Sequence, residues 1–329
     1  MAMERCPPEI WHYILSPICN DGGTTALRLS SVSKFIRSIS ASVRFQSATC
    51  KTSRSIISLT YALESTPPHQ RIMRHLFISS TRWQPPPPTS SSRSRPIQGA
   101  KIRSSAARDG SIHYAILHIL TLVAPTLQTL SMVAHCSTWV QLPLPPSLPA
   151  LQEMSIQHEF PGGCLVPSAL DSLQEAPALK MLILVGFLRV SQPIEIAGTI
   201  RSFAPGLTHL LLPRDAGNGD RLLRSFAREV CLNALGPNSR INGEGEKELP
   251  TALEALFLGT AAGRPLFIMA QNGKRIMPSN NRSNPSLDHS GEMHIHWSAR
   301  LEGRKGYWKD DWPDVPVEKL SLPRLQLGQ

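Results

Sequence analysis

One short phrase recurs along this chain and limits what it can fold into. Its clearest copies begin at Leu127, Leu151, Leu179, Leu207 and Leu253, and each has further apolar residues three and five positions later. The first four copies also have a proline two residues before that leucine. The second and third apolar positions are two apart, so in a strand they face the same side. Because the first four copies follow one another at 24 or 28 residues, the sequence predicts a stack of strand–helix units.

The phrase resembles the leucine-rich repeat. That resemblance implies an α/β solenoid of parallel strands, with the strands inside the curve and the helices outside. Weaker copies start at Met73 and Val317. The helical spacers are expected at 112–122, 167–173, 194–203 and 219–235. An ordinary α/β domain with several short apolar strands is the alternative.

The N-terminal segment has a different pattern, typical of short packed helices. Pro7 and Pro8 followed by Glu9 indicate a helix start. A polar turn at 20–23 follows, and then apolar residues recur at steps of three and four in 24–39. These features predict a compact helical hairpin or a trio of helices, which is small enough to need further support.

This segment resembles an F-box motif in Pro-Pro-Glu-Ile at 7–10, Leu-Arg-Leu at 27–29 and Val-Ser-Lys at 32–34. The resemblance covers residues 4–42 and implies a three-helix module that docks on a Skp-type adaptor, which in turn bridges to a cullin–RING ubiquitin ligase. Carried over position by position, it places six residues at the adaptor or directly behind it: Pro7, Ile10, Leu27, Leu29, Val32 and Ile36. A generic amphipathic helical cap on the solenoid is the alternative.

The domain layout follows from these patterns. An F-box-like module is expected at 1–44 and a repeat domain at 45–259. The repeat domain starts with a strand, a helix at 53–63 and a strand at 74–78. A disordered Pro/Ser-rich loop at 84–108 interrupts it. This order resembles fungal F-box proteins with leucine-rich-repeat-like tails. Residues 260–329 are expected to be irregular, with a loop at 271–285, a strand at 293–297 and the last weak copy of the phrase.

The charge is concentrated at one end of the chain. Residues 1–110 hold 15 Lys and Arg against 5 Asp and Glu, while residues 111–329 hold 19 of each. A basic module of this kind favours an acidic partner. It lacks the interleaved aromatic residues and fold signatures of a nucleic-acid-binding module, so nucleic acid is not the partner that the sequence favours.

The remaining motifs exclude several classes of protein. The chain has no run of apolar residues long enough for a membrane span and no secretory leader pattern, so the cytoplasm or nucleus is expected. Its six cysteines form no CxxC pair, which fits a reducing compartment. His294 and His296 alternate as if on one strand face, but no third ligand has a supporting spacing, so neither a metal nor another cofactor is predicted.

The chain also lacks the signatures of an enzyme, because it has no GxSxG elbow, phosphate-binding loop, HExxH or dinucleotide fingerprint. The resemblances therefore predict a non-catalytic substrate receptor of an SCF-type ubiquitin ligase. The alternative is a protein-binding repeat scaffold without a ligase role.

The target would bind on the strand face opposite the repeated leucines. The residues at offsets +2, +4 and +6 in the phrase face that side, and the later copies make it apolar. The predicted target-binding residues are therefore Met181, Ile183, His209, Leu211 and Phe257. An exposed apolar patch of this kind needs a cover. We expect the 260–329 segment to cover it through Trp297, Trp308 or Trp312, with a partner competing for the same patch.

Overall fold

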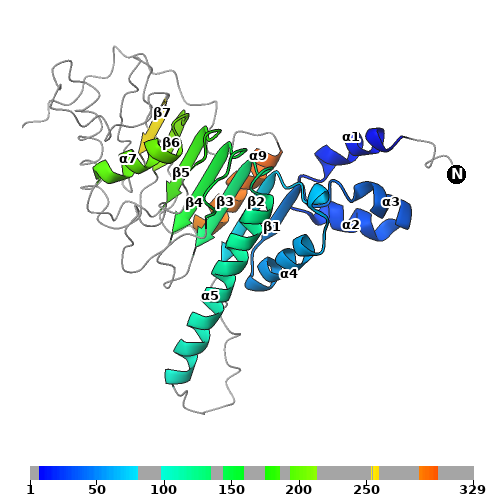
Figure 1. Ribbon diagram of the computed structural model, residues 1–329, viewed down its shortest axis with the longest axis horizontal. Coiled ribbons are helices and arrows are strands. Elements are labelled where there is room, and N and C mark those ends of the chain that lie inside the picture. Colours follow the sequence, from blue (N-terminus) through cyan, green and yellow to red (C-terminus); the bar gives the residue numbers. More distant parts are fainter. Residues whose placement is uncertain are drawn as a thin grey trace, which may run out of the picture.

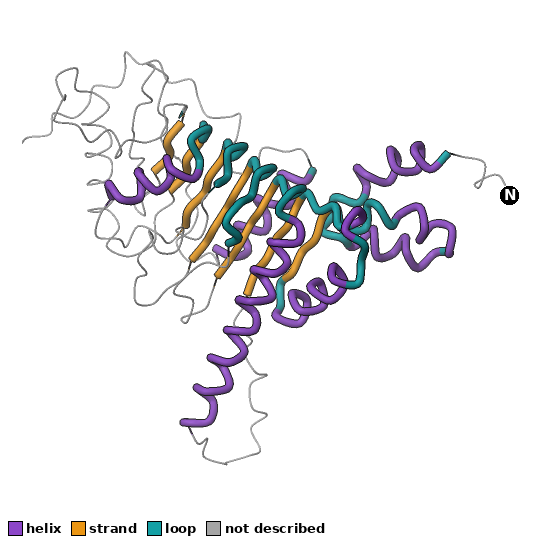
Figure 2. The backbone as a smooth tube through the Cα atoms, in the orientation of Figure 1, coloured by secondary structure: helices purple, strands orange, loops and turns teal. Residues whose placement is uncertain are grey.

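A single parallel sheet runs through the protein in sequence order. The computed structural model describes residues 7–80, 98–134, 144–158, 175–185, 193–212, 253, 255–258 and 289–302. Within them the seven strands pair in the order β1 to β7 (Figures 1 and 2), namely β1 (Ser47–Cys50), β2 (His75–Ser80), β3 (Thr129–Ala134), β4 (Glu153–His158), β5 (Met181–Val185), β6 (His209–Leu212) and β7 (Ala255–Leu258). The expected α/β class with a parallel sheet is confirmed, and the arrangement is compatible with a solenoid.

The repeated phrase sets the register of the strands. Its second position aligns from strand to strand at Leu76, Leu130, Met154, Leu182 and Leu210. These residues are fully buried, as are the leading residues of the same copies, among them Met73 and Leu127. The assignment of the apolar offsets to one buried face is therefore confirmed for these copies.

A row of shared carbonyl groups joins each repeat to the next one. The carbonyl of the residue before a strand accepts hydrogen bonds from two consecutive N–H groups of the following repeat, at 2.8–3.1 Å. The residues concerned are Gln46, Arg74, Gln128, Gln152 and Lys180. Because the same bond pair recurs five times, each strand begins at the same height as its neighbour.

Helices α4 (Ser53–Glu64), α5 (Gln98–Val123) and α7 (Pro193–Phe203) lie on the face that receives the repeated leucines (Figure 1). The helices predicted at 53–63 and 194–203 are confirmed. The helix predicted at 112–122 is also present, but α5 begins earlier, so the loop predicted over 84–108 is wrong from residue 98 onward. A helix that is already nucleated on a buried half extends at little cost into residues such as Ala, Lys and Arg.

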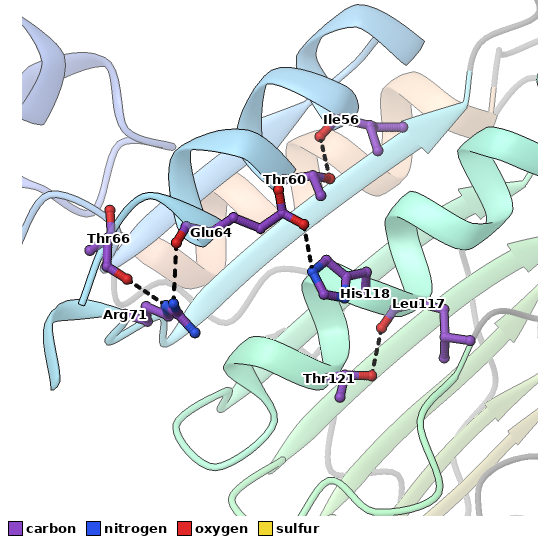
Figure 3. Close-up of polar contacts among 8 residues, drawn as sticks. All are labelled: Ile56, Thr60, Glu64, Thr66, Arg71, Leu117, His118 and Thr121. Carbon is purple, nitrogen blue, oxygen red and sulfur yellow. Dashed lines mark hydrogen bonds and ion pairs between the residues drawn. The ribbon is translucent and has the colours of Figure 1, made fainter. Parts of the chain in front are cut away.

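One polar contact joins α4 to α5, and others lie at the C-terminal end of α4 (Figure 3). Glu64 Oε1 lies 2.9 Å from Nε2 of His118 on α5. Arg71 donates hydrogen bonds to the carbonyls of Thr66 at 2.7 Å and Glu64 at 3.3 Å. Its guanidinium therefore provides donors for carbonyl groups at the C-terminal end of α4 that have no partner within the helix.

The N-terminal helices form a trio beside the β1 edge of the sheet (Figure 1), comprising α1 (Pro8–Ile18), α2 (Thr24–Val32) and α3 (Lys34–Ser40). The periodic stretch 24–39 is broken at Ser33, which is extended and whose hydroxyl accepts a 3.1 Å bond from the Ile36 N–H. That hydroxyl caps α3 and starts a new helix. A small core, separate from that of the sheet, contains Leu15, Cys19, Ala26 and Val43.

The strand predicted at 293–297 is wrong, because these residues belong to helix α9 (His289–Leu301). Polar and apolar residues alternate over 293–297, which is typical of a strand. His294, Trp297 and Leu301 are also spaced three and four residues apart, which is typical of one helix face. The helix is favoured because it packs this apolar face, with Trp297, against the sheet. The spacers predicted at 167–173 and 219–235, the loop at 271–285 and the copy at Val317 lie outside the described residues.

Truncating a repeated leucine should destabilise the protein. For Leu182→Ala we expect a loss of about 2–5 kcal/mol in unfolding free energy, because a fully buried leucine leaves a cavity in the core. Urea denaturation checks this. Tyr61→Ala on the exposed side of α4 is the control and should shift stability by no more than about 0.5 kcal/mol. Equal stability of Leu182→Ala and the wild type would contradict the assigned register.

Replacing each of two glycines with alanine should change the stability of the protein in opposite directions. Gly22 has a φ of +78°, and an added Cβ would collide with Thr49. Gly22→Ala should therefore cost about 1–3 kcal/mol. Gly110 lies in α5 with open space around an added Cβ, so Gly110→Ala should stabilise by about 1 kcal/mol. Thermal melts of both variants test this, and a destabilised Gly110→Ala would contradict the helix assignment.

Candidate protein-binding surfaces

The helical trio exposes large apolar side chains although it has a core of its own. Six of them are exposed on α1 and α2: Ile10, Tyr13, Ile14, Ile18, Leu27 and Val32. Leu27 and Val32 keep 59% and 68% of their surface accessible, and Ile10 keeps 48%. Large apolar side chains left exposed in this number on two short helices are typical of a protein interaction site. We refer to these six residues as the trio surface.

The six residues predicted at the adaptor divide into two groups. Pro7, Ile10, Leu27 and Val32 are exposed. Leu29 and Ile36 are half-buried, and Leu29 packs on the core of the trio. The prediction missed Tyr13, Ile14 and Ile18, although the recurrence of isoleucine every four residues from Ile10 is a visible signal for one helix face.

The trio is bonded to the sheet through the end of α1 and the turn that follows it. Gln46, which precedes β1, accepts from Ser16 Oγ and donates to Asn20 Oδ1, both at 2.9 Å. The Gly22 N–H donates to Ser47 Oγ at 2.9 Å, and its carbonyl accepts from the Thr49 N–H at 3.1 Å. The turn therefore binds the free side of β1 much as a further strand would.

Helix α9 covers the opposite face of the sheet, where it packs on β2, β3 and β4 (Figure 1). Trp297 is only 2% exposed, and its ring lies 5.6 Å from that of Phe77. Val133 and Ile183 complete this small apolar cluster, with Leu211 and Leu301 at its margin. The expectation that the C-terminal segment covers this face through Trp297 is confirmed, whereas Trp308 and Trp312 lie outside the described residues.

The same face carries polar side chains that are out of contact with water. Glu153 on β4 pairs with Arg300 on α9 at 2.9 Å, and the carboxylate side chain is only 7% exposed. Four further polar residues of the strands are buried on this side: Ser79, Ser131, Ser155 and Gln157. The hydroxyls of Ser79 and Ser131 and the indole N–H of Trp297 have no hydrogen-bond partner in the described part of the chain.

Four of the predicted target-binding residues, Met181, Ile183, His209 and Leu211, lie on this face. Ile183 is fully buried under it, while Met181, His209 and Leu211 are half-buried. Phe257 is the register partner of Leu211 on β7. The same offsets place Glu153 on this face, two positions after Leu151, but it was not among the predicted target-binding residues. Phe77, four positions after Met73, was not predicted either.

No group of residues suited to holding a metal ion occurs among the described residues. None of the described helices combines the length and the apolar character needed to cross a membrane. Scans of protein-family models, of curated proteins and of solved structures found no match to this chain.

Two histidines on the α9 side of the sheet have pKa values below the usual one. Burial lowers the pKa of His75 to about 4, with Arg74 adding to the effect and Glu153 opposing it. Burial also lowers the pKa of His294, helped by Lys51. In the unfolded chain a histidine has its usual pKa of about 6.5, so between pH 6.5 and about 4 the unfolded state binds more protons at His75 than the folded state does.

Stability should therefore fall as the pH is lowered through this window. We expect urea unfolding of the wild type to show lower stability at pH 5.0 than at pH 7.5. His75→Gln, which cannot be protonated, should lose less stability over the same interval. His69→Gln changes an exposed histidine and serves as the matched control. An equal loss in all three proteins would contradict the assignment to His75.

Proposed function

We propose that this chain is a substrate receptor of an SCF-type cullin–RING ubiquitin ligase. In this proposal the trio surface binds a Skp-type adaptor, and the sheet domain holds a target protein. The observation that carries it is the exposure of Ile10, Leu27 and Val32 on a helical trio whose sequence resembles an F-box. A module that keeps these side chains in water although it has its own core gains free energy when a partner buries them.

The attachment of the trio to β1 supports the same proposal. A receptor of this type performs no chemistry itself. It raises the effective concentration of the target beside the ubiquitin-transferring enzyme. Such an effect depends on a defined distance and orientation between the two binding sites. The hydrogen bonds that join Gln46 and Ser47 to the α1–α2 turn restrict that orientation.

Adaptor binding should depend on the exposed members of the trio surface. Burial of each Leu or Ile contributes about 1.5–3 kcal/mol, and 1.4 kcal/mol corresponds to a tenfold change in affinity. The double substitution Ile10→Ala with Leu27→Ala should therefore weaken binding to a purified Skp-type adaptor by about a hundredfold in calorimetry. Because both side chains are exposed in the chain alone, the double variant should keep the wild-type melting temperature.

The control variant is Tyr61→Ala, which removes an exposed aromatic side chain from α4 and should leave adaptor affinity unchanged. If the wild type binds no adaptor, or if the double variant binds as tightly as the wild type, the ligase role is wrong. The alternative is then a repeat scaffold that binds a protein through its sheet domain.

A further inference from the structure

The two faces of the sheet are covered to very different extents. Helices α4, α5 and α7 bury one continuous core that extends from Phe45 to Leu210. On the other face α9 forms a separate small cluster that contains Phe77, Val133, Ile183 and Trp297. Because the two clusters share no residue, removal of α9 would leave the large core and the strand register in place.

The surface under α9 is also incompletely matched to that helix. The hydroxyls of Ser79 and Ser131 and the indole N–H of Trp297 are buried without a partner in the described residues. A buried polar group without a hydrogen bond destabilises the arrangement that buries it. The indole N–H of Trp297 belongs to α9 itself, so it regains a hydrogen bond to water when the helix lifts and lowers the free-energy cost of that step.

The surface continues beyond the helix that covers it. Helix α9 packs mainly on β2, β3 and β4, and its contacts extend to the margin of β5 and β6, where Arg300 Nη2 lies 4.0 Å from the sulfur of Met181 and Leu211 packs against the Trp297 cluster. His209 on β6 is half-buried on the same side. An occupant longer than α9 would contact both regions. The contacts of α9 itself define the chemistry of that occupant, since Trp297 meets Phe77 and, three residues on, Arg300 meets Glu153.

We propose that the face covered by α9 is the target-binding surface and that α9 is a removable placeholder for the target. The target presents a helix with a bulky aromatic residue and, three residues later, an arginine. The aromatic side chain enters the Phe77–Ile183 cluster and the guanidinium pairs with Glu153, whose buried carboxyl group already pairs with the guanidinium of Arg300 and therefore favours a cationic partner. This inference refines the target-binding half of the proposed function and does not depend on adaptor binding.

The test uses the full chain and, as the probe, a fluorescent peptide with the sequence of residues 289–302. The substitutions Trp297→Ala and Arg300→Ala in the chain weaken its own α9. This double variant should bind the peptide at least about tenfold more tightly than the wild type does, because the internal competitor is weaker. Adding Glu153→Gln to the double variant should reduce peptide affinity about tenfold, since the charged bond to arginine is lost.

Glu64→Gln, which changes a carboxylate on the opposite side of the sheet, is the matched control and should leave peptide affinity unchanged. A peptide that carries alanine in place of Arg300 should bind weakly and should no longer respond to Glu153→Gln. The proposal is overturned if the double variant binds no peptide or if its affinity is insensitive to Glu153→Gln. It is also overturned if the wild type forms dimers that the peptide dissociates, because the occupant would then be α9 of a second copy.

Hydrogen exchange of the wild type provides an independent measurement should the double variant fail to fold. The amides of α9 should exchange faster than those of β3 and β4, through an opening that leaves the sheet intact. Exchange of α9 only together with β3 and β4 would make the helix a permanent part of the core and would overturn the proposal. Since neither experiment contains an adaptor, failure here is distinguishable from failure of the ligase assignment.

Discussion

Burial of the repeated apolar positions against α4, α5 and α7 is the interaction on which the rest of the structure depends. Each copy of the phrase places two residues, such as Leu182 and Leu184, on one side of a strand and a third, such as Leu179, just before it, and all three are fully buried in the same core. A slip of one residue would turn this set to the opposite face, so the register is strongly determined. The shared carbonyls that precede the strands then hold successive repeats at one height.

The composition of the second face of the sheet is a consequence of the burial of the leucines on the first face. Once the leucines occupy one side, the even positions must point to the other, and these include serines, Glu153 and His75 as well as Phe77 and Ile183. Such a mixed surface cannot form a dry core by itself. Helix α9 provides an aromatic side chain for the apolar part and a guanidinium for the carboxylate.

The helical trio depends on the sheet in another way. Its own core is small, and the turn between α1 and α2 is held by hydrogen bonds to Gln46, Ser47 and Thr49. Gly22 makes this close approach because any side chain there would collide with Thr49. An added Cβ would also lie 3.5 Å from Trp297, so the trio, the first strand and the helix over the second face meet at this turn.

The sequence alone determined the parallel strands, their buried positions and the helices at 53–63 and 194–203, because these follow from local periodicity and from the spacing of the repeated phrase. The apolar residues of the trio surface were also visible as a pattern, including Ile14 and Ile18, which recur at four-residue steps from Ile10 although they were not among the predicted residues; Tyr13 does not fit that step. The start of α5 at Gln98 was not visible, since a polar stretch becomes helical only as the extension of a buried helix.

Only the tertiary structure decided that residues 289–301 form a helix and that Arg300 finds Glu153. The local alternation at 293–297 was compatible with a strand, and a stripe at helical spacing was present in the same residues. The sheet face resolves the ambiguity, because it buries Trp297 and pairs a carboxylate that lies 147 positions earlier in the chain. No periodicity within a short window contains a contact over that separation, so the partner of Glu153 had to come from the folded arrangement.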